Sequence, residues 1–132
     1  MSKAASVAAL VGRRVLIVED ELLTAMEMER LLSELGCEVM GPAPSLTSAI
    51  ALLDQDRPDL AVLDIQLGTE RVTPVAERLE ARGIPFVLVT GYGHLELKEP
   101  ALQGAPRLSK PVEESEIIRA LARLLPDRGR AA

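Results

Sequence analysis

Hydrophobic residues in this chain fall into short apolar runs that are separated by longer stretches with a helical repeat. The apolar runs lie within 14–18, 60–63 and 85–90. Runs of this length, rich in β-branched residues and bounded by breakers such as Pro58 and Gly68, are typical of strands buried on both faces. The pattern therefore predicts three buried strands.

Two further segments predict less buried strands. Residues 37–41 alternate polar and apolar positions, as a half-buried strand near a sheet edge does, and 42–44 continue as an extended link rich in proline. Residues 106–109 form a short last strand. The sequence thus predicts five strands in all.

Apolar residues between the strands recur at i, i+3, i+4 and i+7, which predicts amphipathic helices. Acidic residues are favoured in the first turn of a helix and glycine after its last turn. The first expected helix has Met28, Leu31, Leu32 and Leu35 on its apolar face and ends at Gly36. The second is capped by Ser45 and carries Leu46, Ala49, Ile50 and Leu53, and the third has Thr73 as N-cap and Pro74 as its first residue. The closing helix has Glu113, Glu114 and Glu116 in its first turn, Ile117, Ala120, Leu121 and Leu124 on its apolar face, and Pro126 at its end.

One stretch breaks this rhythm. Residues 91–105 contain Gly91, Gly93, Pro100 and Gly104, and their apolar positions support one or two helical turns at most. Strand–helix alternation implies parallel strands with helices on both faces of the sheet. We therefore predict an α/β fold with a doubly wound five-stranded parallel sheet and a shortened or mobile fourth helix.

The length of 132 residues suits one domain with a real core. We expect a globular domain over 13–126. Residues 1–12 are expected to form a short N-terminal extension, a frayed helix without a targeting role, and 127–132 a frayed C-terminal tail.

Composition narrows the function. The net charge of −5 and the 2% of aromatic residues argue against nucleic-acid binding, which needs a basic face and stacking platforms. No apolar stretch reaches the roughly 18 residues of a membrane span. The single cysteine, Cys37, has no intramolecular disulfide partner and lies in an apolar segment, so we expect a small buried residue and a cytoplasmic protein.

Polar residues follow four of the predicted strands at their carboxyl ends. They are the acidic pair Glu19 and Asp20, then Asp64, Thr90 and Lys110. In a parallel sheet these ends share one edge, where ligands bind. Three carboxylates together call for a hard cation such as Mg²⁺, lysine and threonine can hold a phosphoryl group, and a carboxylate can attack phosphorus. The set predicts phosphoryl transfer to Asp64. For the neighbouring Glu21 we expect only a helix-capping role.

The residues at these strand ends resemble the receiver domain of two-component response regulators. The resemblance spans about 14–125 and rests on Val-Leu-Ile-Val-Glu-Asp-Glu at 15–21, Leu-Asp-Ile-Gln-Leu-Gly at 63–68, Thr-Gly at 90–91 and Lys-Pro at 110–111. It implies a flavodoxin-like strand order, 2-1-3-4-5. It also implies the roles of the site residues: Asp64 as phosphoacceptor, Glu19 and Asp20 as metal-binding pair, the Gln66 carbonyl as a further Mg²⁺ ligand, Thr90 as switch hydroxyl and Lys110 as contact to the phosphoryl group.

The chain departs from the family pattern around the switch. The position three before Lys110, aromatic in many receivers, is Arg107. The segment 85–93 resembles a single-domain subgroup with a Phe-Ala-Thr-Gly-Tyr-type motif, in which the fourth helix is short or mobile. Tyr92 then serves as the movable aromatic residue, or simply packs its ring over a loop. His94 is expected on a surface loop and not in a metal site.

The resemblance implies a stand-alone receiver that accepts a phosphoryl group from a sensor histidine kinase or phosphotransfer protein and switches contacts with a downstream protein. It would be a signalling protein and not an enzyme acting on other substrates. The expected partner face is the region of the fourth helix, fifth strand and fifth helix. The alternatives are a phosphorylation-independent binding module or a phosphate sink. A metal-dependent aspartyl-phosphate hydrolase is disfavoured, because the position of its second acid is Gln66.

Overall fold

Five parallel strands form the central sheet across residues 2–91 and 96–126, the part of the chain that this computed structural model describes. The order is β2-β1-β3-β6-β7, which confirms the predicted flavodoxin-like arrangement. The central strand β3 and its neighbour β6 are buried at every residue. The strands are β1 (Arg14–Val18), β2 (Glu38–Ala43), β3 (Leu60–Asp64), β6 (Phe86–Thr90) and β7 (Arg107–Ser109).

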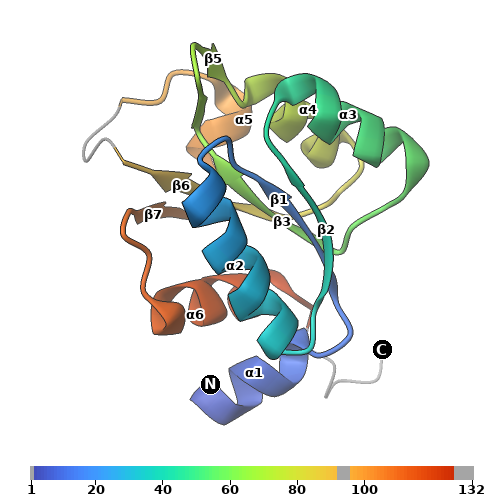
Figure 1. Cartoon of the computed structure of the whole chain (residues 1–132), viewed down its shortest axis with the longest axis vertical. Helices are drawn as coiled ribbons and strands as arrows, with labels where there is room; N and C mark the ends of the chain where they lie inside the picture. Colours follow the sequence, from blue (N-terminus) through green and yellow to red (C-terminus); the bar gives the residue numbers. More distant parts are fainter. Residues whose placement is uncertain (1, 92–95, 127–132) are drawn as a thin grey trace.

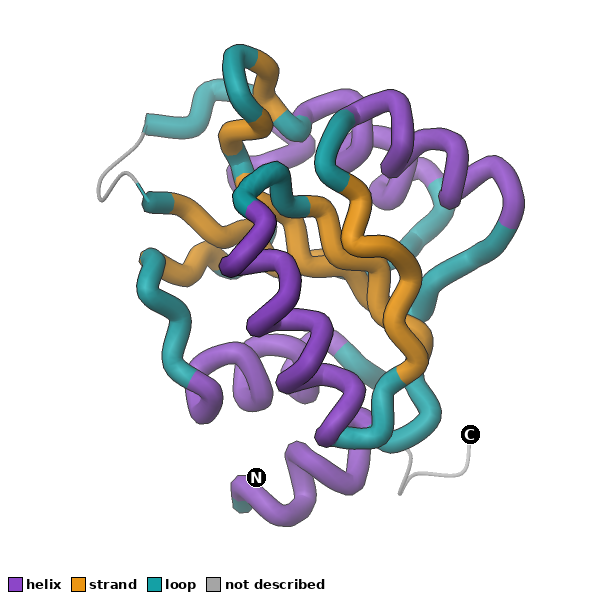
Figure 2. The backbone as a smooth tube through the Cα atoms, in the orientation of Figure 1, coloured by secondary structure: helices purple, strands orange, loops and turns teal. Residues whose placement is uncertain are grey.

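Helices cover both faces of this sheet (Figures 1 and 2). One face packs against α1 (Lys3–Leu10), α2 (Leu22–Glu34) and α6 (Glu114–Leu124), and the other against α3 (Leu46–Gln55), α4 (Thr73–Ala81) and α5 (Pro100–Gln103). Two aliphatic cores result, one on each side, because β1, β3 and β6 send side chains alternately to the two faces. No helix among the described residues has the length and apolarity to cross a membrane.

The helix boundaries follow the predicted caps with one exception. The Ser45 hydroxyl accepts the Ser48 backbone N–H at 3.1 Å and begins α3, as expected. Glu113 caps α6 with Glu114 and Glu116 in the first turn. The prediction for α4 was wrong by one residue: Val72 is its N-cap, without a side-chain hydrogen bond, and Thr73 is already helical. The Thr73 hydroxyl is instead bonded to a glutamate before α5.

Three features go beyond the sequence analysis. Strand β2 continues to Ala43, through the segment expected to be only a link. Residues 66–71 form an antiparallel hairpin of β4 (Gln66–Leu67) and β5 (Glu70–Arg71). The N-terminal extension is helical but packed instead of frayed, since α1 lies against α6 and Leu10 is fully buried.

The short helix α5 has four residues, which confirms the predicted shortening of the fourth helix. Cys37 is buried, as expected, and its thiol donates to the Leu10 carbonyl oxygen at 3.4 Å. Burial raises the pKa of this thiol, so its reactivity is low.

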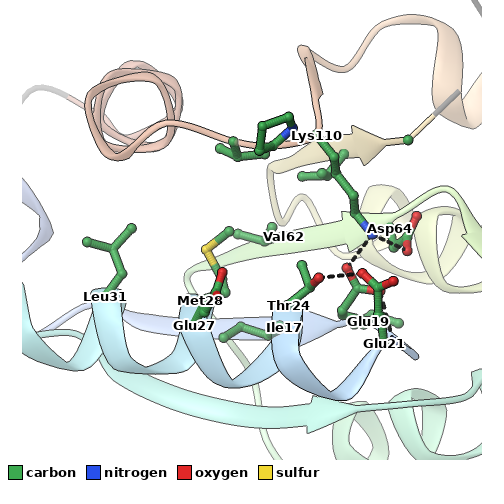
Figure 3. Close-up of a pocket in the computed structure, with 15 residues that line it drawn as sticks. Ile17, Glu19, Glu21, Thr24, Glu27, Met28, Leu31, Val62, Asp64 and Lys110 are labelled. Atoms are coloured by element: carbon green, nitrogen blue, oxygen red, sulfur yellow. Dashed lines mark hydrogen bonds and ion pairs between the residues drawn. The ribbon is translucent and has the colours of Figure 1, made fainter. Parts of the chain in front are cut away.

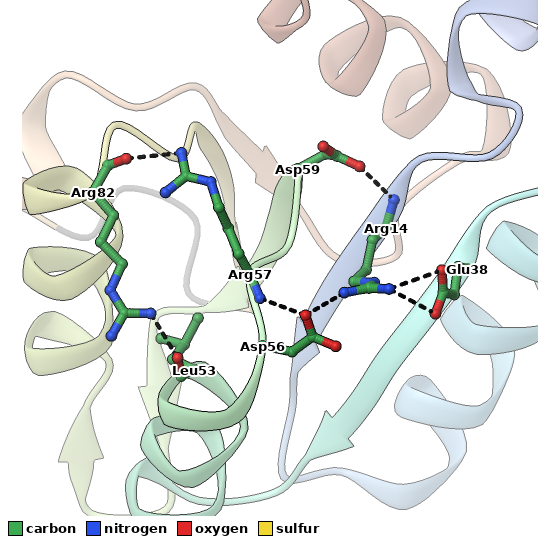
Figure 4. A network of polar contacts seen from close by, with 7 residues as sticks. All are labelled: Arg14, Glu38, Leu53, Asp56, Arg57, Asp59 and Arg82. Carbon is green, nitrogen blue, oxygen red and sulfur yellow. Dashed lines mark hydrogen bonds and ion pairs between the residues drawn. The ribbon is translucent and has the colours of Figure 1, made fainter.

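Polar contacts hold the amino ends of three strands together (Figure 4). The Arg14 backbone N–H donates to the Asp59 carboxylate at 2.8 Å, and the Asp59 N–H returns a bond to the Arg14 carbonyl. The Arg14 guanidinium also pairs with Glu38 and Asp56. These contacts join β1, β2 and the segment before β3 at the edge opposite the candidate site, and so fix the strand register that aligns that site.

Candidate functional site

Strand register places the predicted site residues at one edge of the sheet. Val18 pairs with Leu63, so Glu19 emerges beside Asp64. Asp64 pairs with Val89, and Thr90 pairs with Ser109, which directly precedes Lys110. Four neighbouring strands thus end within one pairing step of one another. The sequence predicted this convergence, because parallel strands must end at a common edge.

A lysine lies between two buried carboxylates at this edge (Figure 3). The Lys110 Nζ atom is 2.6 Å from Glu19 Oε1 and 3.0 Å from Asp64 Oδ2. Glu19 is 6% exposed and Asp64 7% exposed. The second Glu19 oxygen accepts the Glu21 backbone N–H at 3.1 Å. Lys110 is therefore held in place by both acids and points at the phosphoacceptor candidate.

Asp20 is exposed and completes an acidic cluster. Ligand oxygens of Glu19, Asp20 and Asp64 lie within 4.8 Å of one another. The Asp20 Oδ2 atom accepts the Gly68 N–H at 2.9 Å, and Asp64 Oδ1 accepts the Gln66 N–H at 3.3 Å. Backbone donors of the β4–β5 hairpin thus face two of the three carboxylates.

The protonation behaviour of this cluster shows a shortage of positive charge. Burial, together with a hydrogen bond to Asp64, raises the pKa of Glu19 to about 7 in spite of Lys110. Burial opposes the charge of Lys110, but its bonds to Glu19 and Asp64 outweigh this and raise its pKa, so Lys110 stays a cation. One lysine for three carboxylates leaves the site negative. These oxygen donors fit a hard divalent cation such as Mg²⁺, which prefers carboxylate and carbonyl ligands.

The remaining predicted residues lie around this cluster. Thr90 is 1% exposed at the end of β6, next to the β7 end that leads to Lys110. Gln66 begins the hairpin in β4, and its side-chain amide donates to the Gly68 carbonyl at 3.0 Å. Arg107 lies exposed on β7. Glu21 is the N-cap residue of α2, and its carboxylate accepts the Thr24 hydroxyl without capping the backbone. Tyr92 and His94 lie outside the described residues.

A cavity of about 410 Å³ opens beside the acidic cluster. Lys110, Glu19 and Asp64 form one end of it, and the rest is lined by apolar side chains together with polar residues of and before α2, Glu21, Thr24 and Glu27 (Figure 3). The apolar part lies between Met28 and Leu31 of α2 and the Pro-Val pair at 111–112. Sequence analysis missed this cavity and the Gly68 contact, since it treated the α2 residues as core and Gly68 only as a strand breaker.

Comparisons with known proteins agree with the resemblance to receiver domains seen in the sequence. The family model of the response regulator receiver domain matches residues 15–122. The transcriptional regulatory protein PdtaR of Mycobacterium tuberculosis is 33% identical over 116 residues, which cover 86% of this chain and 57% of that protein. The phyllosphere-induced regulator PhyR of Methylorubrum extorquens is 31% identical over 121 residues, covering 89% of this chain and 45% of that protein.

Among solved structures, SdrG from Sphingomonas melonis Fr1 is 39% identical with a TM-score of 0.73, and the match covers 88% of this chain and 97% of SdrG. The chain spans about half the length of the curated relatives that it matches.

Proposed function

Because the chain belongs to the response regulator receiver family, we propose that it accepts a phosphoryl group from a phosphohistidine onto Asp64 and so switches its contacts with other proteins. The observation that carries this proposal is the position of Lys110, a half-buried cation held between the buried carboxylates of Glu19 and Asp64. The phosphodonor would be a sensor histidine kinase or phosphotransfer protein. The phosphorylated chain would then act on a downstream protein.

In the proposed transfer, an Asp64 oxygen attacks the phosphorus in line, a P–O bond forms, and the P–N bond to the imidazole of the donor breaks. The imidazole leaves and takes up a proton. Lys110, already 3.0 Å from Asp64, pairs with the phosphoryl oxygens, and the Thr90 hydroxyl donates to one of them. The product is an aspartyl phosphate.

Asp20, Asp64 and the Gln66 carbonyl would hold Mg²⁺, with Glu19 acting directly or through water. The ion supplies charge neutralisation for the phosphoryl oxygens when bound. Water later hydrolyses the acyl phosphate, and Gln66 and Tyr92 are proposed to tune its lifetime. On phosphorylation, Thr90 and the segment 91–105, which contains Tyr92, would shift between two states. Arg107 on β7 is proposed to take part in this switch.

The test is the intact mass after incubation with acetyl phosphate and Mg²⁺. We expect the wild-type chain to gain one phosphoryl group, and Asp64→Asn to gain none because the nucleophile is lost. Asp59→Asn is the matched control, since this aspartate lies at the opposite end of the strand. A wild-type chain that no phosphodonor modifies, with or without a kinase, would contradict the proposal and favour a phosphorylation-independent binding module.

A further inference from the structure

The β4–β5 hairpin contacts the acidic site through backbone N–H groups of β4 and the turn, and it contacts the short helix α5 through the side chain that ends β5. At the site, its Gly68 and Gln66 N–H groups donate to Asp20 and Asp64. The Val72 N–H donates to the Ile65 carbonyl at 2.9 Å and closes the base of the hairpin. The hairpin is thus bonded to two of the carboxylates that would bind the cation and the phosphoryl group.

An ion pair joins Arg71, the last residue of β5, to the start of α5. The Arg71 Nη1 atom lies 3.2 Å from Glu99 Oε2, and the Thr73 hydroxyl donates to the same oxygen at 3.2 Å. Glu99 is the N-cap residue of α5. Figure 1 shows β5 next to α5, although about thirty residues of chain separate them.

Both sides of this contact are partly shielded from water. The side chains of Arg71 and Glu99 are 35% and 29% exposed. Slight burial acts to raise the pKa of Glu99, but its own backbone N–H, the Thr73 hydroxyl and the Arg71 charge lower it overall, so Glu99 stays ionised. Leu67 of the hairpin also shares one apolar cluster with Leu97 and Leu102 of the α5 region.

These contacts make the hairpin a physical link between site and helix. A cation held by Asp20 competes with the Gly68 N–H for the carboxylate, and a phosphoryl group on Asp64 changes the acceptor that faces the Gln66 N–H. Either event changes the forces on the hairpin. Because Arg71 and Thr73 hold Glu99, a displaced hairpin displaces the first turn of α5.

We propose that Arg71 and Glu99 are positioning residues that couple the occupancy of the acidic site to the placement of α5. The inference rests on the proposed function and adds a route to it: the signal crosses from Asp64 to α5 through the hairpin and not only along the chain after Thr90. Coupling is reciprocal, so the same pair also tunes how well the site binds its ligands.

The test is hydrogen–deuterium exchange of the 96–105 segment in the full chain, with and without Mg²⁺ and beryllofluoride as phosphoryl mimic. Loading of the site is measured separately by fluorine NMR of the bound beryllofluoride. We expect loading to change exchange in this segment about 5-fold or more in the wild type, in line with ordinary coupling between sites. In Arg71→Gln and Glu99→Gln the site still loads but this change is largely lost, and Arg71→Lys restores it.

The matched control is Arg78→Gln. Arg78 forms an exposed ion pair with Asp54 at 3.1 Å, which joins α4 to α3 and involves neither the hairpin nor α5. This variant should respond like the wild type. An unchanged response in a fully loaded Arg71→Gln variant, or an equal loss in Arg78→Gln, would overturn the coupling while leaving the proposed function intact. A wild-type chain that does not bind beryllofluoride with Mg²⁺ would instead overturn the proposed function, and the coupling with it.

Discussion

At the scale of single residues, both carboxylate oxygens of Glu19 are engaged by the protein itself. One oxygen pairs with Lys110 at 2.6 Å, and the other accepts the Glu21 N–H. The side chain has therefore little freedom to turn toward a cation, while the exposed Asp20 has more. Sequence analysis could name both acids because they directly follow a buried strand. It could not show that Glu19 pairs with Lys110 while Asp20 is freer to bind a cation, since this depends on which carboxylate lies next to Lys110.

Glu19→Gln should slow the phosphorylation of Asp64 by acetyl phosphate about tenfold or more. The variant loses a charged partner of Lys110, and a hydrogen bond to a charged group contributes about 1.5–3 kcal/mol. The rate is read from the intact mass as a function of time. Glu21→Gln serves as control, because the exposed Glu21 side chain accepts the Thr24 hydroxyl of α2, and the substitution leaves in place the Glu21 backbone N–H that bonds Glu19. Equal rates for Glu19→Gln and the wild type would show that the ion pair does not assist transfer.

At the scale of elements, the strands and long helices were predictable and the smallest elements were not. The apolar runs of β1, β3 and β6 and the repeats of α2, α3 and α6 reflect burial that recurs along the sequence. The hairpin strands have two residues each, too few to show a period. Helix α1 consists mostly of small apolar residues without a distinct polar face, so only its contact with α6 reveals which side is buried.

The packing of α1 can be tested with Leu10→Ala. Leu10 is fully buried in the core that contains Ile117 and Leu121 of α6, so the truncation should lower the free energy of unfolding by about 2–5 kcal/mol. Val11→Ala is the control, because Val11 is 53% exposed and surface changes usually stay within about 0.5 kcal/mol. Urea denaturation followed by circular dichroism gives both values. Similar values for the two variants would mean that α1 does not contribute to the fold.

At the scale of the whole molecule, topology accounts for the site. A parallel sheet brings residues up to about ninety positions apart to one edge, and Glu19 and Lys110 meet there because β1, β3, β6 and β7 are neighbours. The sequence showed which residues would converge. It did not show the cavity between α2 and the segment after β7, because cavities depend on how side chains from separate elements fail to fill space.

Mg²⁺ should stabilise the whole fold through the acidic cluster. At a concentration about 100-fold above its dissociation constant, an ion that binds only the folded state adds about 2.7 kcal/mol to the free energy of unfolding. Thermal unfolding with and without Mg²⁺ measures this shift. Asp20→Asn should lose most of it, whereas Asp56→Asn, at the opposite edge of the sheet, should keep it. A shift of the same size in Asp20→Asn would place the bound ion elsewhere.

The positions of α1 and α6 also determine where a reporter or an anchor can be attached to the protein without blocking the acidic site. Helix α1 leads directly into the amino end of β1, and Leu124 at the end of α6 lies beside residues 84–86 at the amino end of β6. The end of α1 and the end of α6 therefore both lie near the amino ends of the strands, whereas Asp64 ends β3 at the opposite edge of the sheet. A fluorescent reporter or a surface anchor attached directly after α6 should leave the approach of a phosphodonor unobstructed, which makes this scaffold suitable for an engineered biosensor.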